Sequence, residues 1–240
     1  MNCNGSVVDG CGNELICSMD PLFRNRTEAG QLLAERLLRY SHRAGVVVLA
    51  LPRGGVPVGQ AIASRLGLPL DILIVHKLSL PAYKELAIGA LSSDGIRILN
   101  TGIIDEHAIS NETIESIAAR EADEIRRRET LYCGHRVGLA VENQTVILAD
   151  DGIATGATVR AAIEVLRRKK AKRIIVAIPT IARATFHEIR SRVDELEAII
   201  VPEQFESVGE WYEDFSQLTD EEVCARLASA GAKARSEGRT

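Results

Sequence analysis

Two adjacent carboxylates, Asp150 and Asp151, follow the apolar run Val146–Ala149 and precede a short turn of small and hydroxyl residues. A helical apolar pattern begins directly after that turn, so its backbone N–H groups would lie at a helix N-terminus, where phosphate binds well. The carboxylates cannot bind phosphate, but they accept hydrogen bonds from sugar hydroxyls or face a divalent cation. The sequence therefore predicts a sugar-phosphate site. The turn consists of Ala154, Thr155, Gly156, Ala157 and Thr158.

A second anion-binding turn is predicted after another apolar run, Val46–Leu51. It contains Arg53, whose guanidinium can hold two phosphate oxygens at once. Gly54 and Gly55 follow, and glycine lets the backbone approach an anion closely. Such a turn is often purely structural, so the prediction depends on its pairing with the acidic run.

Lys77 is the third candidate, because it follows the predicted strand 71–75 and would face the same edge of a parallel sheet. The polar, proline-containing segment after it is long enough to close over a ligand as a mobile loop. His76 fits a structural role as well as a functional one, and Glu85 could orient Lys77 or a metal. Farther along, Trp211 is the only tryptophan, and its aromatic surroundings indicate either a stacking wall for a planar ligand or a hydrophobic seal.

Strands that are apolar at every position alternate with helical patterns, which is typical of an α/β fold with a parallel, doubly wound sheet flanked by helices. A small variable hood would follow the last strand. Ligands bind such sheets beyond the carboxyl ends of the strands. The predicted strands are 46–51, 71–75, 146–149, 174–178 and 198–201; the helices are 28–40 with Thr27 as N-cap, 56–66, 112–131, 159–169 and 183–192; and an edge hairpin joins 87–91 to 96–99.

Length and composition restrict the protein class. The chain has 240 residues, of which 46% are hydrophobic, so it can bury the core of one α/β domain. A net charge of -4 and 4% aromatic residues give no general attraction to nucleic acid. The sequence shows neither a membrane span nor a secretion signal, so we expect a cytoplasmic protein. We also expect a homodimer.

We expect three segments. Residues 1–22 form a disordered leader, residues 23–218 form the domain with its hood at 201–218, and residues 219–240 form a helix and tail. The spacing of the five cysteines fits no zinc site, and we expect Cys133 and Cys224 to be buried, inert thiols.

The run 146–159 resembles the signature of the type I phosphoribosyltransferases, which bind 5-phosphoribosyl-1-pyrophosphate (PRPP). The resemblance implies that Asp150 and Asp151 hold the ribose hydroxyls and that the turn 154–158 wraps the 5′-phosphate. It also implies that the Arg53 loop, with Gly54 and Gly55, holds the pyrophosphate, often through an unusual peptide conformation. Mg²⁺ would be the cofactor, reaching Asp150 and Asp151 indirectly through the ribose hydroxyls.

The implied reaction transfers the phosphoribosyl group to a nitrogenous acceptor, expected to be a nucleobase, and releases pyrophosphate. Catalysis would fall to Lys77, Arg53, Asp150 and Asp151, and Trp211 would contact the substrate. Ala154 stands where the oxopurine enzymes place an aspartate base, so a hypoxanthine or guanine acceptor is less expected. Two alternatives stay open: a regulator that binds PRPP without transfer, and a hydrolase of phosphoribosyl compounds.

Overall fold

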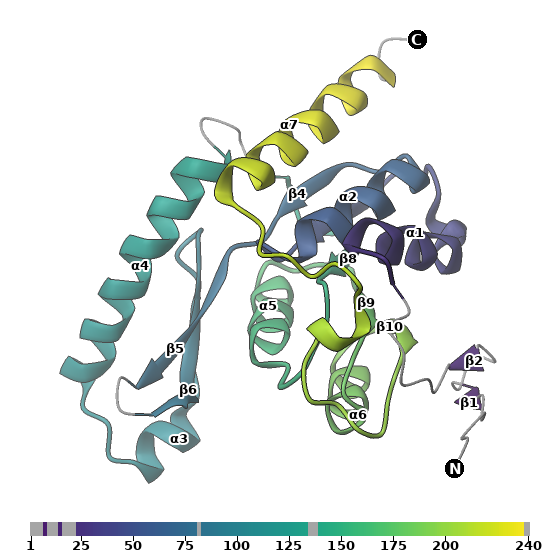
Figure 1. Ribbon diagram of the computed structural model, residues 1–240. Helices are drawn as coiled ribbons and strands as arrows, with labels where there is room; N and C mark the ends of the chain where they lie inside the picture. The colour runs from purple at the N-terminus through teal and green to yellow at the C-terminus, as the bar shows by residue number, and fades with distance from the viewer. Residues whose placement is uncertain (1–6, 9–13, 16–22, 81–82, 134–138, 238–240) are drawn as a thin grey trace.

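The computed structural model describes residues 7–8, 14–15, 23–80, 83–133 and 139–237 (Figure 1). Within the predicted leader, two short strands, β1 (Val7–Val8) and β2 (Glu14–Leu15), pair antiparallel. The predicted disorder of the rest of that leader lies outside the described residues, as do its three cysteines.

A five-stranded parallel sheet with strand order β10-β9-β8-β3-β4 forms the centre of the molecule. This confirms the predicted α/β fold. Four of its strands are buried at almost every position, as the continuous apolar runs predicted. The strands are β3 (Val46–Ala50), β4 (Leu70–Ile72), β8 (Thr145–Ala149), β9 (Arg173–Thr180) and β10 (Glu195–Ile200).

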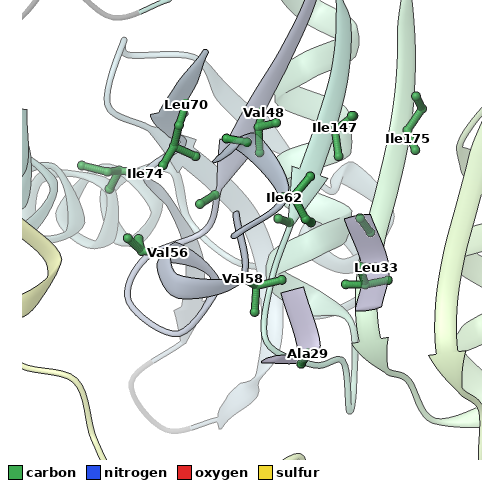
Figure 2. Close-up of a cluster of buried hydrophobic side chains, with 14 of the residues drawn as sticks. Ala29, Leu33, Val48, Val56, Val58, Ile62, Leu70, Ile74, Ile147 and Ile175 are labelled. Carbon is green, nitrogen blue, oxygen red and sulfur yellow. The ribbon is translucent and has the colours of Figure 1, made fainter. Parts of the chain in front are cut away.

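Helices cover both faces of the sheet because successive strand residues point to opposite sides. Val48 and Ile147 pack with Leu33 and Ile62 from the helices of one face, as Figure 2 shows. Their neighbours along the strands, such as Leu148, belong to the apolar cluster on the other face. The first face carries α1 (Arg26–Arg36) and α2 (Gly55–Leu66), and the second carries α5 (Ala157–Arg168) and α6 (Arg183–Arg192).

The first helix starts and ends differently from the prediction. Asn25, in an extended conformation, accepts hydrogen bonds from the backbone N–H groups of Thr27 and Glu28, so Asn25 and not Thr27 is the N-cap. The helix ends at Arg36, and a separate 3-10 turn, η1 (Leu38–Tyr40), follows. Asparagine and threonine both cap helices well, and their order alone did not discriminate between them.

The predicted strand 71–75 is confirmed at its start but wrong at its end, because β4 ends at Ile72 in the parallel sheet and a new strand starts at Val75. The segment expected to be a mobile loop instead pairs antiparallel, and the fully buried side chains of Leu78 and Ile88 explain why. The hairpin around Ser92 is confirmed, but in this second sheet and not at the edge of the first. The second sheet contains β5 (Val75–Leu80), β6 (Tyr83–Ser92) and β7 (Arg97–Leu99), and α3 (Thr101–Glu106) and α4 (Asn111–Cys133) follow it.

The C-terminal part of the chain returns across the parallel sheet as the hood and continues into α7 (Asp220–Glu237), which packs on α2 and α4 (Figure 1). The hood contains a single 3-10 turn, η2 (Gly209–Trp211). Val223 and Leu227 of α7 belong to the hydrophobic core. None of the described helices is both long and apolar enough to cross a membrane.

Candidate active site

The two predicted anion-binding turns lie side by side because β3 and β8 are neighbouring parallel strands, with Ala50 opposite Ala149. From β3 the chain continues to β4 on one side, whereas from β8 it continues to β9 and β10 on the other. The boundary between β3 and β8 is therefore the switch point in strand order, where α/β sheets bind ligands.

Gly54 and Gly55 allow the two turns to touch. A Cβ atom at Gly54 would lie 1.9 Å from Asp151 Oδ2, and one at Gly55 would lie 2.6 Å from the carbonyl oxygen of Ala149. The Pro52–Arg53 peptide bond is cis, which is the kind of unusual conformation that the resemblance implied. The glycines thus serve this close contact between the turns.

The acidic pair is electrostatically asymmetric. Asp150 Oδ1 accepts a hydrogen bond from the backbone N–H of Asp151 at 2.9 Å. Burial, and then the charge of Asp151, raise the pKa of Asp150 well above its usual range. Asp151 is instead paired with a cation, Arg26, at 2.8 Å. A ligand that donates hydroxyl hydrogens would favour the ionised form of Asp150.

Arg26 was not among the predicted site residues. Its Nε donates to Asp151 Oδ2, its Nη1 donates to the carbonyl oxygen of Ser216 at 2.9 Å, and its guanidinium lies 3.8 Å from the ring centroid of Phe215. Tyr212 adds a hydrogen bond from its hydroxyl to the carbonyl oxygen of Asp151 at 2.6 Å. These partners lie 125 and 190 positions from Arg26, so no local sequence signal could have identified it.

Side chains of α5 and α6 fix the predicted phosphate turn, residues 154–158, by donating hydrogen bonds to its carbonyl oxygens. Thr185 Oγ1 donates to the carbonyl oxygen of Ala154 at 2.6 Å, and Arg160 Nη1 donates to that of Thr155 at 2.8 Å. Gly156 has a φ of 75°, and a Cβ there would lie 2.7 Å from Thr185 Cγ2. Glycine is therefore required at this position both by conformation and by space.

The amides of this turn lead directly into α5. Ala157 is the first residue of that helix, and the exposed Thr158 is the second. First-turn N–H groups of a helix have no partners within the helix, so they are available to an anion. The N-terminus of α5 therefore lies where the sequence predicted a phosphate-binding turn.

A pocket of about 420 Å³ opens between the turns and the hood, lined in part by Arg53, Gly54 and Asp151. Arg53 Nη1 lies 3.9 Å from Asp220 Oδ1 at the start of α7. Tyr132 also donates its hydroxyl to Asp220, and burial together with this contact raises the pKa of Tyr132 to about 12. The arginine loop thus contacts the start of α7 and, through Asp220, is linked to the end of α4.

Lys77 lies inside β5 opposite Ala90. It lines a different pocket, of about 520 Å³, together with Ala157 and Arg160. The structure therefore places Lys77 near the start of α5, and its role toward pyrophosphate stays a prediction. Its neighbour His76 has its Nδ1 3.0 Å from Glu121 Oε2. The side chain of Glu85 lies outside the described ones.

Trp211 is only 5% exposed, and its ring stacks with that of Phe205 at a centroid distance of 6.4 Å. This placement favours the hydrophobic seal over the stacking wall. Cys224 is partly buried, its Sγ lies 3.1 Å from the carbonyl oxygen of Leu131, and burial raises its pKa, as expected for an inert thiol. The side chain of Cys133 lies outside the described ones.

Comparison with known proteins places this geometry in a family. The family model of the phosphoribosyl transferase domain matches residues 24–213. A Mycobacterium tuberculosis H37Rv protein, whose name assigns it provisionally to the phosphoribosyl transferases, is 37% identical over 209 residues, covering 87% of this chain and 47% of that protein. The chain thus spans about half the length of the curated relatives it matches.

Among solved structures, TT1426 from Thermus thermophilus is 38% identical, with a TM-score of 0.79 over 87% of this chain and 98% of that one. The segment that the family model matches, residues 24–213, contains the acidic pair, the phosphate turn and the arginine loop, whereas α7 lies beyond it. The chain belongs to the phosphoribosyl transferase domain family.

Proposed function

We propose that this protein transfers the 5-phosphoribosyl group of PRPP to a nitrogenous acceptor, a nucleobase being the expected class, and releases pyrophosphate. One observation carries the proposal. The arginine loop and the acidic pair are in van der Waals contact at the switch point of the sheet, and the phosphate turn follows on the same strand-to-helix connection. One bound molecule with a phosphate, a vicinal diol and a pyrophosphate would engage all three.

Each group has a distinct task. Amides of the turn 154–158 bind the 5′-phosphate, and Asp150 and Asp151 accept hydrogen bonds from the ribose hydroxyls. Arg53 holds the departing pyrophosphate, with Lys77 predicted to assist. The carboxylates also favour the positive charge that builds on the ribose ring as the C1–oxygen bond to pyrophosphate breaks and the bond to the acceptor nitrogen forms.

The residues present fit an indirect magnesium site. In the described part of the chain no group of three histidine, cysteine or acidic side chains could hold a metal by itself. Asp150 is close to Asp151, but Arg26 already binds one oxygen of Asp151. When bound, Mg²⁺ would neutralise pyrophosphate oxygens and so stabilise the leaving group. Asp150 and Asp151 would therefore hold it indirectly, through the ribose hydroxyls of PRPP.

The acceptor must bring its own nucleophilic nitrogen without help from the phosphate turn. Ala154 is exposed and has no group that could accept a proton. A hypoxanthine or guanine acceptor that relied on an aspartate at this position would gain nothing here. Adenine-like bases, pyrimidines and simple amines are accordingly the first acceptors to test.

A pyrophosphate-release assay over a panel of bases and amines tests the proposal, with calorimetry of PRPP binding in the presence of Mg²⁺ or a chelator. We expect release with at least one acceptor, and loss of release in the variant Asp150→Asn, Asp151→Asn. Binding of PRPP without release from any acceptor would point to the regulator, and release with water alone would point to the hydrolase. A wild-type protein that neither binds PRPP nor releases pyrophosphate contradicts the proposal.

A further inference from the structure

Arg26 is a buried cation in an unfavourable place. It is the first residue of α1, where the helix dipole repels positive charge, and its side chain is only 10% exposed. Asn25 already caps the helix, so Arg26 is not needed for capping. Its burial is compensated by the opposite charge of Asp151, together with the contacts to Ser216 and Phe215. The candidate site, and not the stability of α1, therefore explains why a buried arginine stands at this position.

The backbone holds Arg26 beside the hood. Phe23 donates its N–H to the carbonyl oxygen of Trp211 at 3.1 Å and accepts one from Glu213 at 2.9 Å. Asp214 donates in the same way to Arg24 at 3.0 Å. This short bridge brings the start of α1 against residues 211–216, which places the guanidinium over Phe215 and next to Ser216.

We propose that Arg26 is a positioning residue, which orients the Asp151 carboxylate toward a ribose hydroxyl and makes that orientation depend on the seating of the hood. The proposal rests on the proposed function. Arg26 binds Oδ2 of Asp151, so the oxygen that would accept the hydrogen bond from the ribose hydroxyl is Oδ1. Substrate binding and hood seating are thereby coupled through one side chain.

The planar guanidinium suits this task better than an ammonium group would. Two of its N–H donors point to two acceptors, Asp151 and Ser216, while its face lies on the ring of Phe215. A lysine could keep the charge but not all three contacts at once. The variant Arg26→Lys should therefore retain only part of the effect.

Calorimetry with three sugar phosphates tests the proposal on the full-length protein. Ribose 5-phosphate is compared with its 2-deoxy and 3-deoxy analogues, each of which lacks one hydroxyl. The variant Asp151→Asn identifies the hydroxyl that Asp151 holds. We expect the wild type to prefer ribose 5-phosphate over that analogue by about tenfold or more, as for a hydrogen bond to a charged group. In Arg26→Gln the preference for ribose 5-phosphate over that analogue should fall to about twofold. The affinity of the variant for the analogue itself should stay within about twofold of the wild-type affinity.

Two comparisons separate positioning from a structural role. Arg24→Gln is the matched control, because the side chain of Arg24 is 73% exposed and pairs with Glu28, so the preference should stay at the wild-type value. The double variant Arg26→Gln, Asp151→Asn should lose no more preference than either single variant.

An unchanged preference in Arg26→Gln overturns the proposal, and so does an equal loss of affinity for all three ligands. If Arg26→Gln does not fold, as thermal unfolding would show, Arg26→Lys decides by the same preference. A wild-type protein that binds none of the sugar phosphates contradicts the proposed function itself, which is a different outcome.

Discussion

At the scale of single residues, the acidic pair carries an electrostatic cost in the folded protein. The raised pKa of Asp150 means that the unfolded chain releases this proton at lower pH than the folded protein does. Stability from this group is therefore lost as pH rises from about 4 through the folded pKa, and the full cost remains above it. The proposed ribose site has to bear this cost, because it keeps two adjacent carboxylates together at a partly buried position.

We expect Asp150→Asn to raise the melting temperature at neutral pH while weakening ribose binding. The amide removes the repulsion, and its oxygen can still accept the hydrogen bond from the N–H of Asp151. A gain on the order of 1 kcal/mol would correspond to ~2–4 °C in a chain of this size. Thermal unfolding at several pH values checks this, since the gain should shrink as pH falls toward about 4. A gain that is constant with pH would contradict the assignment.

Gly54 offers a second test at this scale. Gly54→Ala should greatly weaken PRPP binding, because the added Cβ would overlap the Asp151 carboxylate. Gly102→Ala is the matched control: its Cβ would meet only Asn100 Oδ1, at 3.5 Å, and alanine favours the helix. Calorimetry of PRPP binding compares the two. Wild-type affinity in Gly54→Ala would show that the two turns do not need to touch.

At the scale of elements, α7 is part of the folded domain although it lies beyond the segment that the family model matches. Thr219 and Glu222 form a reciprocal cap at its start, which leaves Asp220 available to Arg53 and Tyr132. The predicted division into a domain to residue 218 and a C-terminal helix and tail stays a prediction, and in the structure α7 packs on the core through Val223 and Leu227.

Leu227→Ala should lower the free energy of unfolding by about 2–5 kcal/mol, as for other buried leucines. Leu227 is 2% exposed in the core, whereas Leu32 on α1 is 45% exposed and provides the control, Leu32→Ala, with a much smaller effect. Chemical denaturation measures both. Equal effects would mean that α7 does not contribute to the core.

The sequence predicted elements well where burial is uniform and poorly where tertiary contacts decide. The strands around Val47 and Val176 are apolar on both faces, as is typical of parallel strands covered by helices on both sides. The segment after Val75 mixes apolar and polar residues, and its pairing depends on a core contributed by α4. The acidic pair, the arginine loop and the phosphate turn could be predicted because each is contiguous; Arg26 could not, because its role depends on a hood 190 positions away.

At the scale of the whole molecule, local stability should be uneven. The strands β3, β8 and β9 are nearly fully buried, whereas neither α3 nor the edge strand β7 has a buried residue. We expect hydrogen exchange followed by mass spectrometry to show α3 and β7 exchanging long before the parallel sheet. Uniform protection would contradict this picture. The homodimer and the cytoplasmic location stay predictions, and sedimentation equilibrium would test the former against a monomer of 26.1 kDa.

The backbone bridge between Phe23 and Tyr212 has a consequence for how such proteins can diversify. A hood exchanged from a relative would bring its own counterpart of Tyr212 and Phe215, but the arginine beneath it comes from the opposite end of the domain. Swapping the hood alone would leave Asp151 paired with an arginine whose other contacts, with residues 215 and 216, have changed. We therefore expect chimeras to keep the contacts of Arg26 only when the first turn of α1 and the hood are exchanged together. The two segments should then come from the same parent protein.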